Sequence, residues 1–164
     1  MGRYRPPAPR SSPYITRDGY AALQDELKGL WVRRRDVTKA LSAAAAEGDR
    51  SENAEYIYRK KELAGIDRRI RYLQKRLPDL KVVSEPQTDR DRVFFGASVT
   101  LEDENGDTVT YRIVGADEFS TGKGWISMDA PLARALLKRA LHEVIEVQLP
   151  EGTRQFCIVA VAYG

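Results

Sequence analysis

The sequence is poor in the residues that form covalent cross-links and metal sites. Its 164 residues include one cysteine, Cys157, and one histidine, His142. A single cysteine cannot form an internal disulfide, which is typical of a protein from a reducing compartment. His142 has no second His or Cys at ligand spacing, which excludes the usual zinc sites. We therefore expect no cofactor of the protein's own.

Long apolar runs are absent as well. No stretch approaches the 18 apolar residues that a membrane-spanning helix needs, and the basic, proline-rich start, MGRYRPPAPRSSP, lacks the apolar centre of a signal peptide. The expected location is the cytoplasm, with no membrane partner. Residues 1–12 are expected to be a disordered tail.

Charge is distributed unevenly along the chain. Residues 1–80 contain 18 Lys and Arg against 11 Asp and Glu, whereas residues 81–164 contain 9 against 13. A basic half favours a polyanionic neighbour such as nucleic acid, although a long solvated helix pair can have the same charge. Composition alone leaves these two interpretations open.

Two apolar stripes with coiled-coil spacing dominate residues 13–78. Thr16 is the expected N-cap of the first helix, Gly48 follows its end, and Pro78 ends the second helix. Because the connection is short, the helices must fold back into an antiparallel coiled-coil hairpin. The stripes comprise Tyr20, Leu23, Leu27, Leu30, Val37, Leu41 and Ala44, then Leu63, Ile66, Ile70, Leu73 and Leu77.

The remaining chain has the alternation of β-strands. Residues 78–92 are polar and contain Pro78 and Pro86, and residues 79–92 are expected to be a linker. Strands are predicted at residues 93–101, 108–114, 144–149 and 154–161, with a hairpin turn at Asn105-Gly106. A short helix is predicted at residues 132–137, with Asp129 as N-cap and Pro131 in its first turn. The fold class is therefore α+β: a helical hairpin followed by a small antiparallel sheet domain, residues 93–164.

The connection between the two helices, residues 47–56, contains four carboxylates. Asp49 and Glu52 have the i, i+3 spacing of a helix capping box, which any helix can use. Two exposed carboxylates are also suitable ligands for Mg²⁺, which needs only one or two from a protein. Placed in a site that already holds a metal and a nucleic-acid phosphate, they could complete a second metal site and orient a water. Spacing does not distinguish these interpretations.

Basic and aromatic residues follow this connection. Arg59, Lys60 and Lys61 could hold an RNA 3′ end, or form an ordinary solvated helix face. Tyr56 and Tyr58 could stack on a base or pack on the partner helix, and packing is favoured for Tyr56 because it falls on the apolar stripe.

Six stretches spread over residues 13–164 carry a resemblance to a known family. They are Ile15-Thr16 to Gly19-Tyr20, Gly48-Asp49-Arg50-Ser51-Glu52-Asn53-Ala54-Glu55-Tyr56, Ile66-Asp67-Arg68-Arg69-Ile70-Arg71-Tyr72-Leu73, Arg92-Val93-Phe94-Phe95-Gly96-Ala97, Tyr111-Arg112-Ile113-Val114-Gly115 and Pro131-Leu132-Ala133-Arg134-Ala135-Leu136-Leu137. They resemble the GreA/GreB family of bacterial transcript-cleavage factors and occur in the family's order. The Asp-Arg-Ser-Glu-Asn and Arg-Val-Phe-Phe-Gly stretches are similar to its GreB branch.

The resemblance implies that the coiled coil enters the secondary channel of RNA polymerase, while a domain similar to FK506-binding proteins docks at the channel rim. Asp49 and Glu52 match the acidic pair that helps to place the second catalytic Mg²⁺, shared with the polymerase, when backtracked RNA is cut. The protein would act as a monomer and as an accessory factor rather than an enzyme. The other implied sites are the RNA contacts Arg59, Lys60 and Lys61, the tip contacts Arg50, Ser51 and Asn53, and the docking residues Asp129, Ala130 and Pro131.

The sequence departs from the family pattern at two places. Ala130 replaces the serine of an Asp-Ser-Pro docking motif, and residues 139–143 lack the family's usual Gly-Lys and Gly-Asp turns. Two other functions remain open: a channel-binding regulator that does not promote cleavage, and a prolyl isomerase in residues 93–164. The second is disfavoured because the pattern shows no apolar, aromatic-lined pocket for proline, and fold alone does not determine function.

Overall fold

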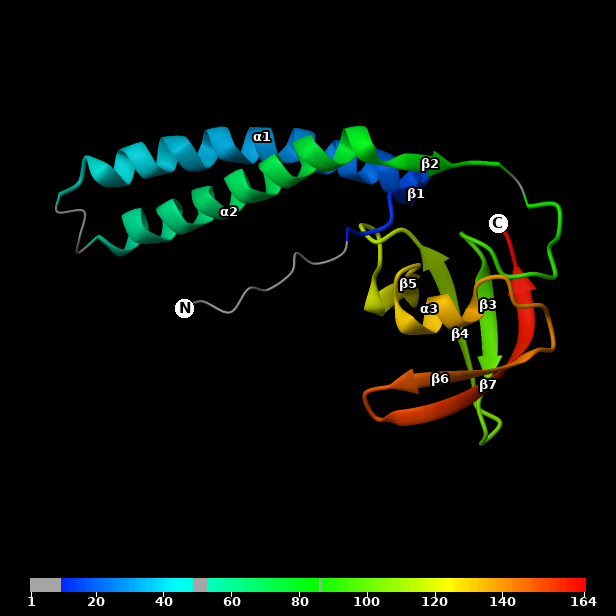
Figure 1. Ribbon diagram of the computed structural model, residues 1–164. Coiled ribbons are helices and arrows are strands. Elements are labelled where there is room, and N and C mark those ends of the chain that lie inside the picture. The colour runs from blue at the N-terminus through cyan, green and yellow to red at the C-terminus, as the bar shows by residue number, and fades with distance from the viewer. Residues whose placement is uncertain (1–9, 49–52, 86) are drawn as a thin grey trace, which may run out of the picture. The chain divides into compact units, whose positions relative to one another are not determined.

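The computed structural model describes residues 10–48, 53–85 and 87–164 and divides into two compact units. The hairpin unit is Tyr20–Leu80, and the sheet unit comprises the chain up to Gly19 together with Lys81–Gly164. The elements shown in Figure 1 are β1 (Tyr14–Thr16), α1 (Arg17–Ala45), α2 (Ala54–Arg76), η1 (Leu77–Asp79), β2 (Lys81–Val83), β3 (Ser98–Glu102), β4 (Thr108–Val114), η2 (Thr121–Lys123), β5 (Trp125–Ser127), α3 (Pro131–Leu136), β6 (Val144–Leu149) and β7 (Gly152–Ala162).

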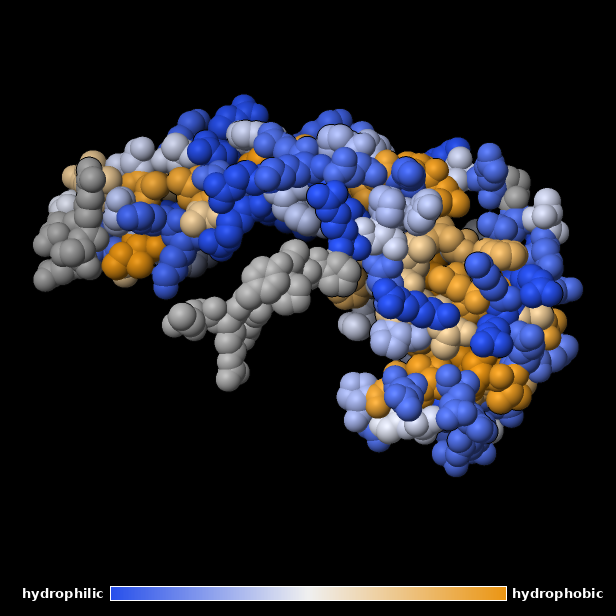
Figure 2. Space-filling model, in the orientation of Figure 1, coloured by the Kyte–Doolittle hydropathy of each residue, from blue (hydrophilic) through white to orange (hydrophobic). Residues whose placement is uncertain are grey.

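The two long helices form the predicted hairpin. Val37 of α1 is buried with Ile66 and Ile70 of α2, and leucines of both helices pack around this centre. At about 1.5 Å per residue, the 29 residues of α1 extend for roughly 44 Å. On the face of the hairpin shown in Figure 2, hydrophilic residues predominate and smaller hydrophobic patches lie between them.

Ion pairs connect the two helices across the hairpin. The guanidinium group of Arg69 contacts both carboxylate oxygens of Glu26, at 2.8 and 2.9 Å. Nearer the connection, Arg33 pairs with Glu62. Arg34, which interrupts the apolar stripe of α1, has its Nε 2.7 Å from Asp67 of α2. The interruption is therefore an ion pair between the helices and does not break their packing.

The sheet unit contains a five-stranded sheet in the order β5-β4-β3-β7-β6. Neighbouring strands are antiparallel except β5, which runs parallel to β4. The sheet is therefore mixed, and the prediction of a purely antiparallel sheet is wrong in this respect. Helix α3 packs on β6, and its residues Ala133 and Leu136 are buried in the core of the unit. The α+β architecture of a helical hairpin and a small β domain is thus confirmed.

Strands β1 and β2 form a separate two-stranded sheet that the sequence pattern did not indicate. They are parallel, and Ile15 of β1 lies opposite Val82 of β2 and is fully buried. Residues 79–92, expected to be a linker, therefore include a short strand. The predicted strand at residues 93–101 is observed only from Ser98, because residues 93–97 form a turn whose backbone bonds to Ile113 and Arg139.

Lys138 and His142 have φ angles of 71° and 74°, which are unusual for residues with a side chain. His142 lies within residues 139–143, the segment that lacks the family's glycine-containing turns, and Lys138 directly precedes that segment. The backbone N–H of Lys138 donates to Val93 at 2.7 Å, and that of His142 donates to Ile158 at 2.8 Å. The turn geometry is thus adopted without glycine and is held by these backbone bonds.

Candidate functional site at the hairpin tip

Asn53 joins the two helices at the end of the hairpin, in residues 46–53, which we call the tip. Its Oδ1 accepts a hydrogen bond from the backbone N–H of Tyr56 at 3.0 Å, which caps the start of α2. Its Nδ2 donates to the carbonyl oxygen of Ala44, in the last turn of α1, at 2.7 Å. The same carbonyl oxygen also accepts from the backbone N–H of Glu47 at 3.2 Å. One side chain therefore bonds to backbone groups at both helix ends, capping α2 and adding a second hydrogen bond to the last turn of α1.

This arrangement corrects the capping interpretation of the acidic pair. Helix α2 begins at Ala54 with Asn53 as its N-cap, so the cap is not the Asp49 and Glu52 box that the i, i+3 spacing allowed. Asp49, Arg50, Ser51 and Glu52 themselves lie outside the described residues. The described residues on either side of them are Gly48, which has a φ of 141°, and Asn53, the N-cap of α2.

The three basic residues predicted to contact RNA have different surroundings. Arg59 contacts Glu55 at 2.8 Å and Glu62 at 3.0 Å. Hydrogen bonds to these two carboxylates raise the pKa of Arg59 above its ordinary value. Lys60 and Lys61 are exposed and have no ion pair with any described residue. Two of the three cations are thus available to a polyanion, whereas Arg59 is already engaged.

Glu62 connects Arg59 of α2 to Arg33 of α1. It accepts hydrogen bonds from Arg33 and Arg59, so four charged side chains form one network across the hairpin. Burial alone would raise the pKa of the Glu62 carboxyl, but the two arginine hydrogen bonds outweigh it and lower the pKa. The network stabilises the hairpin in the region next to the tip.

The tyrosines after the tip differ in exposure. Tyr56 is partly buried, in agreement with its predicted place on the apolar stripe, whereas Tyr58 is 60% exposed. The guanidinium carbon of Arg59 lies 5.5 Å from the centre of the Tyr58 ring, within cation–π distance. Tyr58 is therefore the tyrosine with an accessible ring face.

The residues predicted to dock on a partner lie at the start of α3. Ala130 is the N-cap of this helix and Pro131 is its first residue, so the predicted N-cap role of Asp129 is wrong. The carboxylate of Asp129 instead accepts hydrogen bonds from Ser12, one of them from the backbone N–H at 2.9 Å. Ser12 belongs to the segment expected to be a disordered tail, and it contacts the docking motif directly.

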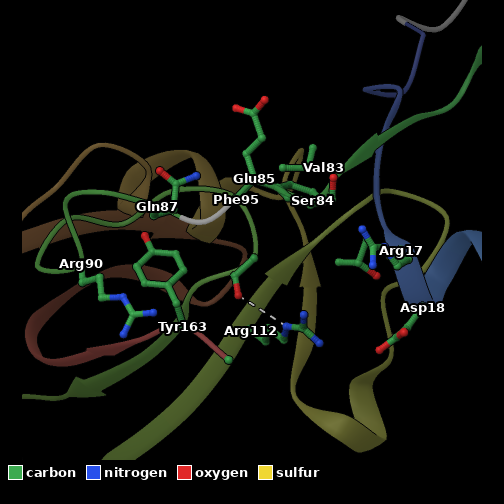
Figure 3. A pocket seen from close by; sticks show the side chains of 13 residues that line it. Arg17, Asp18, Val83, Ser84, Glu85, Gln87, Arg90, Phe95, Arg112 and Tyr163 are labelled. Carbon is green, nitrogen blue, oxygen red and sulfur yellow. Dashed lines mark hydrogen bonds between the residues drawn. The ribbon is translucent and has the colours of Figure 1, made fainter.

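A cavity of about 360 Å³ lies within the sheet unit (Figure 3). Its lining includes Arg17, Arg90 and Arg112, and Arg112 donates to the carbonyl oxygen of Gly96 at 3.4 Å. A proline ring binds to apolar, aromatic surfaces. Phe95 and Tyr163 do lie in this lining, but it also contains the three arginines together with Asp18 and Glu85, so it is not a predominantly apolar pocket. The cavity therefore gives no support to prolyl isomerisation.

Residues 10–48, 53–85 and 87–164 contain no group of three or more His, Cys, Asp or Glu side chains that could hold a metal ion. Within the same ranges, no helix is long and apolar enough to cross a membrane.

Sequence reasoning missed two polar contacts in the sheet unit, Ser12 with Asp129 and Thr16 with Glu118. Thr16 was predicted to be the N-cap of α1, which is confirmed, because its Oγ1 accepts from the backbone N–H of Gly19 at 3.0 Å. Its second role, as a donor to Glu118, joins residues 102 positions apart. No local pattern in the sequence indicates such a contact.

Two family models together match most of the chain. Residues 13–82 match "Transcription elongation factor, N-terminal", and residues 87–163 match "Transcription elongation factor, GreA/GreB, C-term". The boundary between the matches lies close to the beginning of the C-terminal part of the sheet unit, Lys81.

Relatives match over nearly the full length. "Transcription elongation factor GreB" of Xanthomonas axonopodis pv. citri (strain 306) is 57% identical, with 100% of this chain and 99% of the relative covered. The protein of the same name from Pseudomonas aeruginosa is 54% identical, with 99% and 98% covered. A solved structure of the transcription factor Gfh1 is 26% identical, covers 93% of this chain and 97% of its own, and has a TM-score of 0.45. The chain therefore belongs to the GreA/GreB family of transcription elongation factors.

Proposed function

We propose that the protein binds RNA polymerase, inserts its hairpin tip into the secondary channel and stimulates the polymerase's own cleavage of backtracked RNA. The observation that supports this most directly is the position of Asp49 and Glu52. The carboxylate pair lies in the eight-residue connection of an antiparallel hairpin whose first helix is about 44 Å long. A slender support of this length suits delivery of a reactive group into a site that belongs to another protein.

Asp49 and Glu52 are suited to Mg²⁺ by their donor chemistry, since carboxylate oxygens are its preferred ligands and one or two suffice. When bound, the metal would neutralise phosphate charge and activate the attacking water. The carboxylates would hold it beside the polymerase's own metal and orient the water towards the scissile phosphate. The exposed Lys60 and Lys61 would hold the phosphates of the displaced RNA 3′ end.

The remaining predicted contacts complete the proposal. Arg50, Ser51 and Asn53 would contact the channel near the active site, with Asn53 also holding the tip together through Tyr56 and Ala44. The start of α3, with Asp129, Ala130 and Pro131, would dock at the channel rim. Because Asp129 is hydrogen-bonded to Ser12, docking through Asp129 would have to replace or accommodate that contact.

RNA cleavage in a stalled, backtracked elongation complex tests the proposal. The unmodified protein should accelerate release of 3′ fragments in the presence of Mg²⁺. Asp49→Asn and Glu52→Gln should lose most of this acceleration while binding polymerase normally. Glu47→Gln is the matched control, because it removes the same charge from an exposed residue two positions before Asp49.

Full cleavage by both tip variants would overturn the proposed role of the acidic pair. Slowed RNA synthesis without fragment release by the unmodified protein would instead identify a channel-binding regulator that does not promote cleavage.

A further inference from the structure

Glu118 lies in the loop between β4 and η2, and its carboxylate accepts three hydrogen bonds. Oε2 accepts from the backbone N–H of Thr16 at 2.8 Å and from that of Gly115 at 2.9 Å. Oε1 accepts from the hydroxyl of Thr16. A carboxylate that accepts several such bonds forms a strong, charge-assisted attachment. Glu118 thus attaches the segment around Thr16 to its own loop.

Thr16 is the residue at which the chain passes from strand to helix. It is the last residue of β1, paired with Val83 of β2, and its Oγ1 accepts from the N–H of Gly19 in the first turn of α1. The same hydroxyl donates to Glu118. The N-cap of the long helix is therefore itself held by a carboxylate of the sheet unit.

Two glycines show how closely the segment and the loop approach each other. A Cβ atom at Gly19 would lie 2.2 Å from Oε1 of Glu118, and one at Gly115 would lie 2.2 Å from the carbonyl oxygen of Tyr14. Neither glycine has a positive φ, so backbone conformation does not require them. At Gly115 the close neighbour is backbone, so close contact requires a glycine there. At Gly19 a Cβ atom would displace the flexible carboxylate of Glu118 and so disturb the attachment itself.

We propose that Glu118 is a positioning residue for the cleavage activity proposed above. Residues up to Gly19 belong to the sheet unit, and the same helix continues without interruption to Ala45, beside the tip. Glu118 holds the first turn of α1, which is the helix whose last residue adjoins the tip. Without the attachment the first turn frays, and the tip carboxylates spend less time in the productive position. The inference rests on the proposed function.

The variants form matched pairs in the full chain. Glu118→Ala removes all three acceptor interactions, and Glu146→Ala is its control, because Glu146 is exposed on β6. Thr16→Val removes the hydroxyl that contacts both Glu118 and Gly19, whereas Thr16→Ser retains it. The Thr16 pair keeps the inference testable if Glu118→Ala fails to fold.

Two measurements are needed. Amide hydrogen exchange at residues 17–20 should accelerate by about tenfold in Glu118→Ala and Thr16→Val, as expected for the loss of about one charge-assisted hydrogen bond, and by less than about twofold in the controls. With saturating protein, the rate constant of RNA cleavage should fall by a similar factor of about ten in the same two variants, while the Kd for polymerase stays within about twofold.

The outcomes separate the two proposals. If Asp49→Asn abolishes cleavage but Glu118→Ala and Thr16→Val cleave normally at saturation, Glu118 has no positioning role and the proposed function stands. If the loss in these variants lies in Kd alone and excess protein restores cleavage, the inference is also wrong. If the unmodified protein stimulates no cleavage, the proposed function fails, and the positioning role fails with it.

Discussion

Removing the side chain of Asn53 should loosen the hairpin at its tip. Asn53→Ala loses the cap on the N–H of Tyr56 and the bond to the carbonyl oxygen of Ala44. Loss of an N-cap costs about 1 kcal/mol, and loss of one neutral hydrogen bond costs a further amount of about 1 kcal/mol. The local stability should therefore fall by about 2 kcal/mol, or roughly 30-fold in the opening equilibrium. Asn53→Asp retains the capping oxygen and loses only the donor to Ala44, so its cost should be about 1 kcal/mol, or roughly fivefold.

Native-state amide hydrogen exchange on the full chain measures this difference, because it reports local opening of each helix end. The amides of residues 44–47 and 56–58 should exchange faster in the order Asn53→Ala, Asn53→Asp, unmodified protein. Asn105→Ala lies in the β3–β4 turn of the other unit and should leave these amides unchanged. Exchange in Asn53→Ala within about twofold of the unmodified protein would refute the bridging role, and equal effects of both Asn53 variants would refute a separate contribution from the cap.

Three further predictions concern other residues. His142→Gly should raise the free energy of unfolding by about 0.5–1 kcal/mol. Glycine removes the strain of the positive φ of 74°, and this gain exceeds the additional conformational entropy that glycine loses on folding. Unchanged or lower stability in a denaturant titration would contradict this prediction. Tyr163→Phe should cost about 1–2 kcal/mol, since the hydroxyl accepts from Phe94 and donates to Arg92. Burial raises the pKa of Tyr163, although the hydrogen bond from the Phe94 N–H lowers it. The contribution of Tyr163 to the free energy of unfolding is therefore complete below its ordinary pKa of about 10 and is lost as pH rises through the raised folded-state value. A pH titration of thermal unfolding should show less alkaline loss in Tyr163→Phe than in the unmodified protein. The pKa of Glu62 is lowered, so its contribution is present above its ordinary pKa of 4.5 and is lost as pH falls through the folded-state value. The protection factors of the hairpin amides, which are corrected for the intrinsic exchange rate at each pH, should therefore fall less between pH 6 and pH 3 in Glu62→Gln than in the unmodified protein, and an identical pH response would contradict the prediction.

The parts of the fold that follow a regular period could be predicted from sequence. The predicted bounds of β4 and β6 are those observed, because alternating side chains over six or seven residues define a strand that is buried on one face. Strands β1, β2 and β5 were missed, since each has three residues, too few to show a period. Two of them pair across 67 positions, and this pairing depends on the buried side chain of Ile15 rather than on any local turn.

The residue types of the candidate site could be predicted from the sequence, but not which of these residues caps the helix and which contacts the other helix. Asp49, Ser51 and Asn53 are all residue types that cap helices, and they lie within five positions of one another. Asn53 is the cap, and it also donates to Ala44 across the hairpin, a contact that no spacing rule within one helix contains. The attachment of Thr16 to Glu118 was hidden for the same reason, because it joins segments 102 residues apart.

The identity of the cap changes how the acidic pair can be tested. If Asp49 and Glu52 capped α2, replacing them with amides would weaken the helix and lower activity whether or not they bind metal. Because Asn53 carries the cap and the bridge to Ala44, the N–H of Tyr56 and the carbonyl oxygen of Ala44 have a partner that is neither carboxylate of the acidic pair. Asp49→Asn and Glu52→Gln should therefore leave exchange at residues 56–58 unchanged. A loss of RNA cleavage in these variants, with normal exchange there, can then be attributed to the chemistry of the carboxylates rather than to a damaged hairpin.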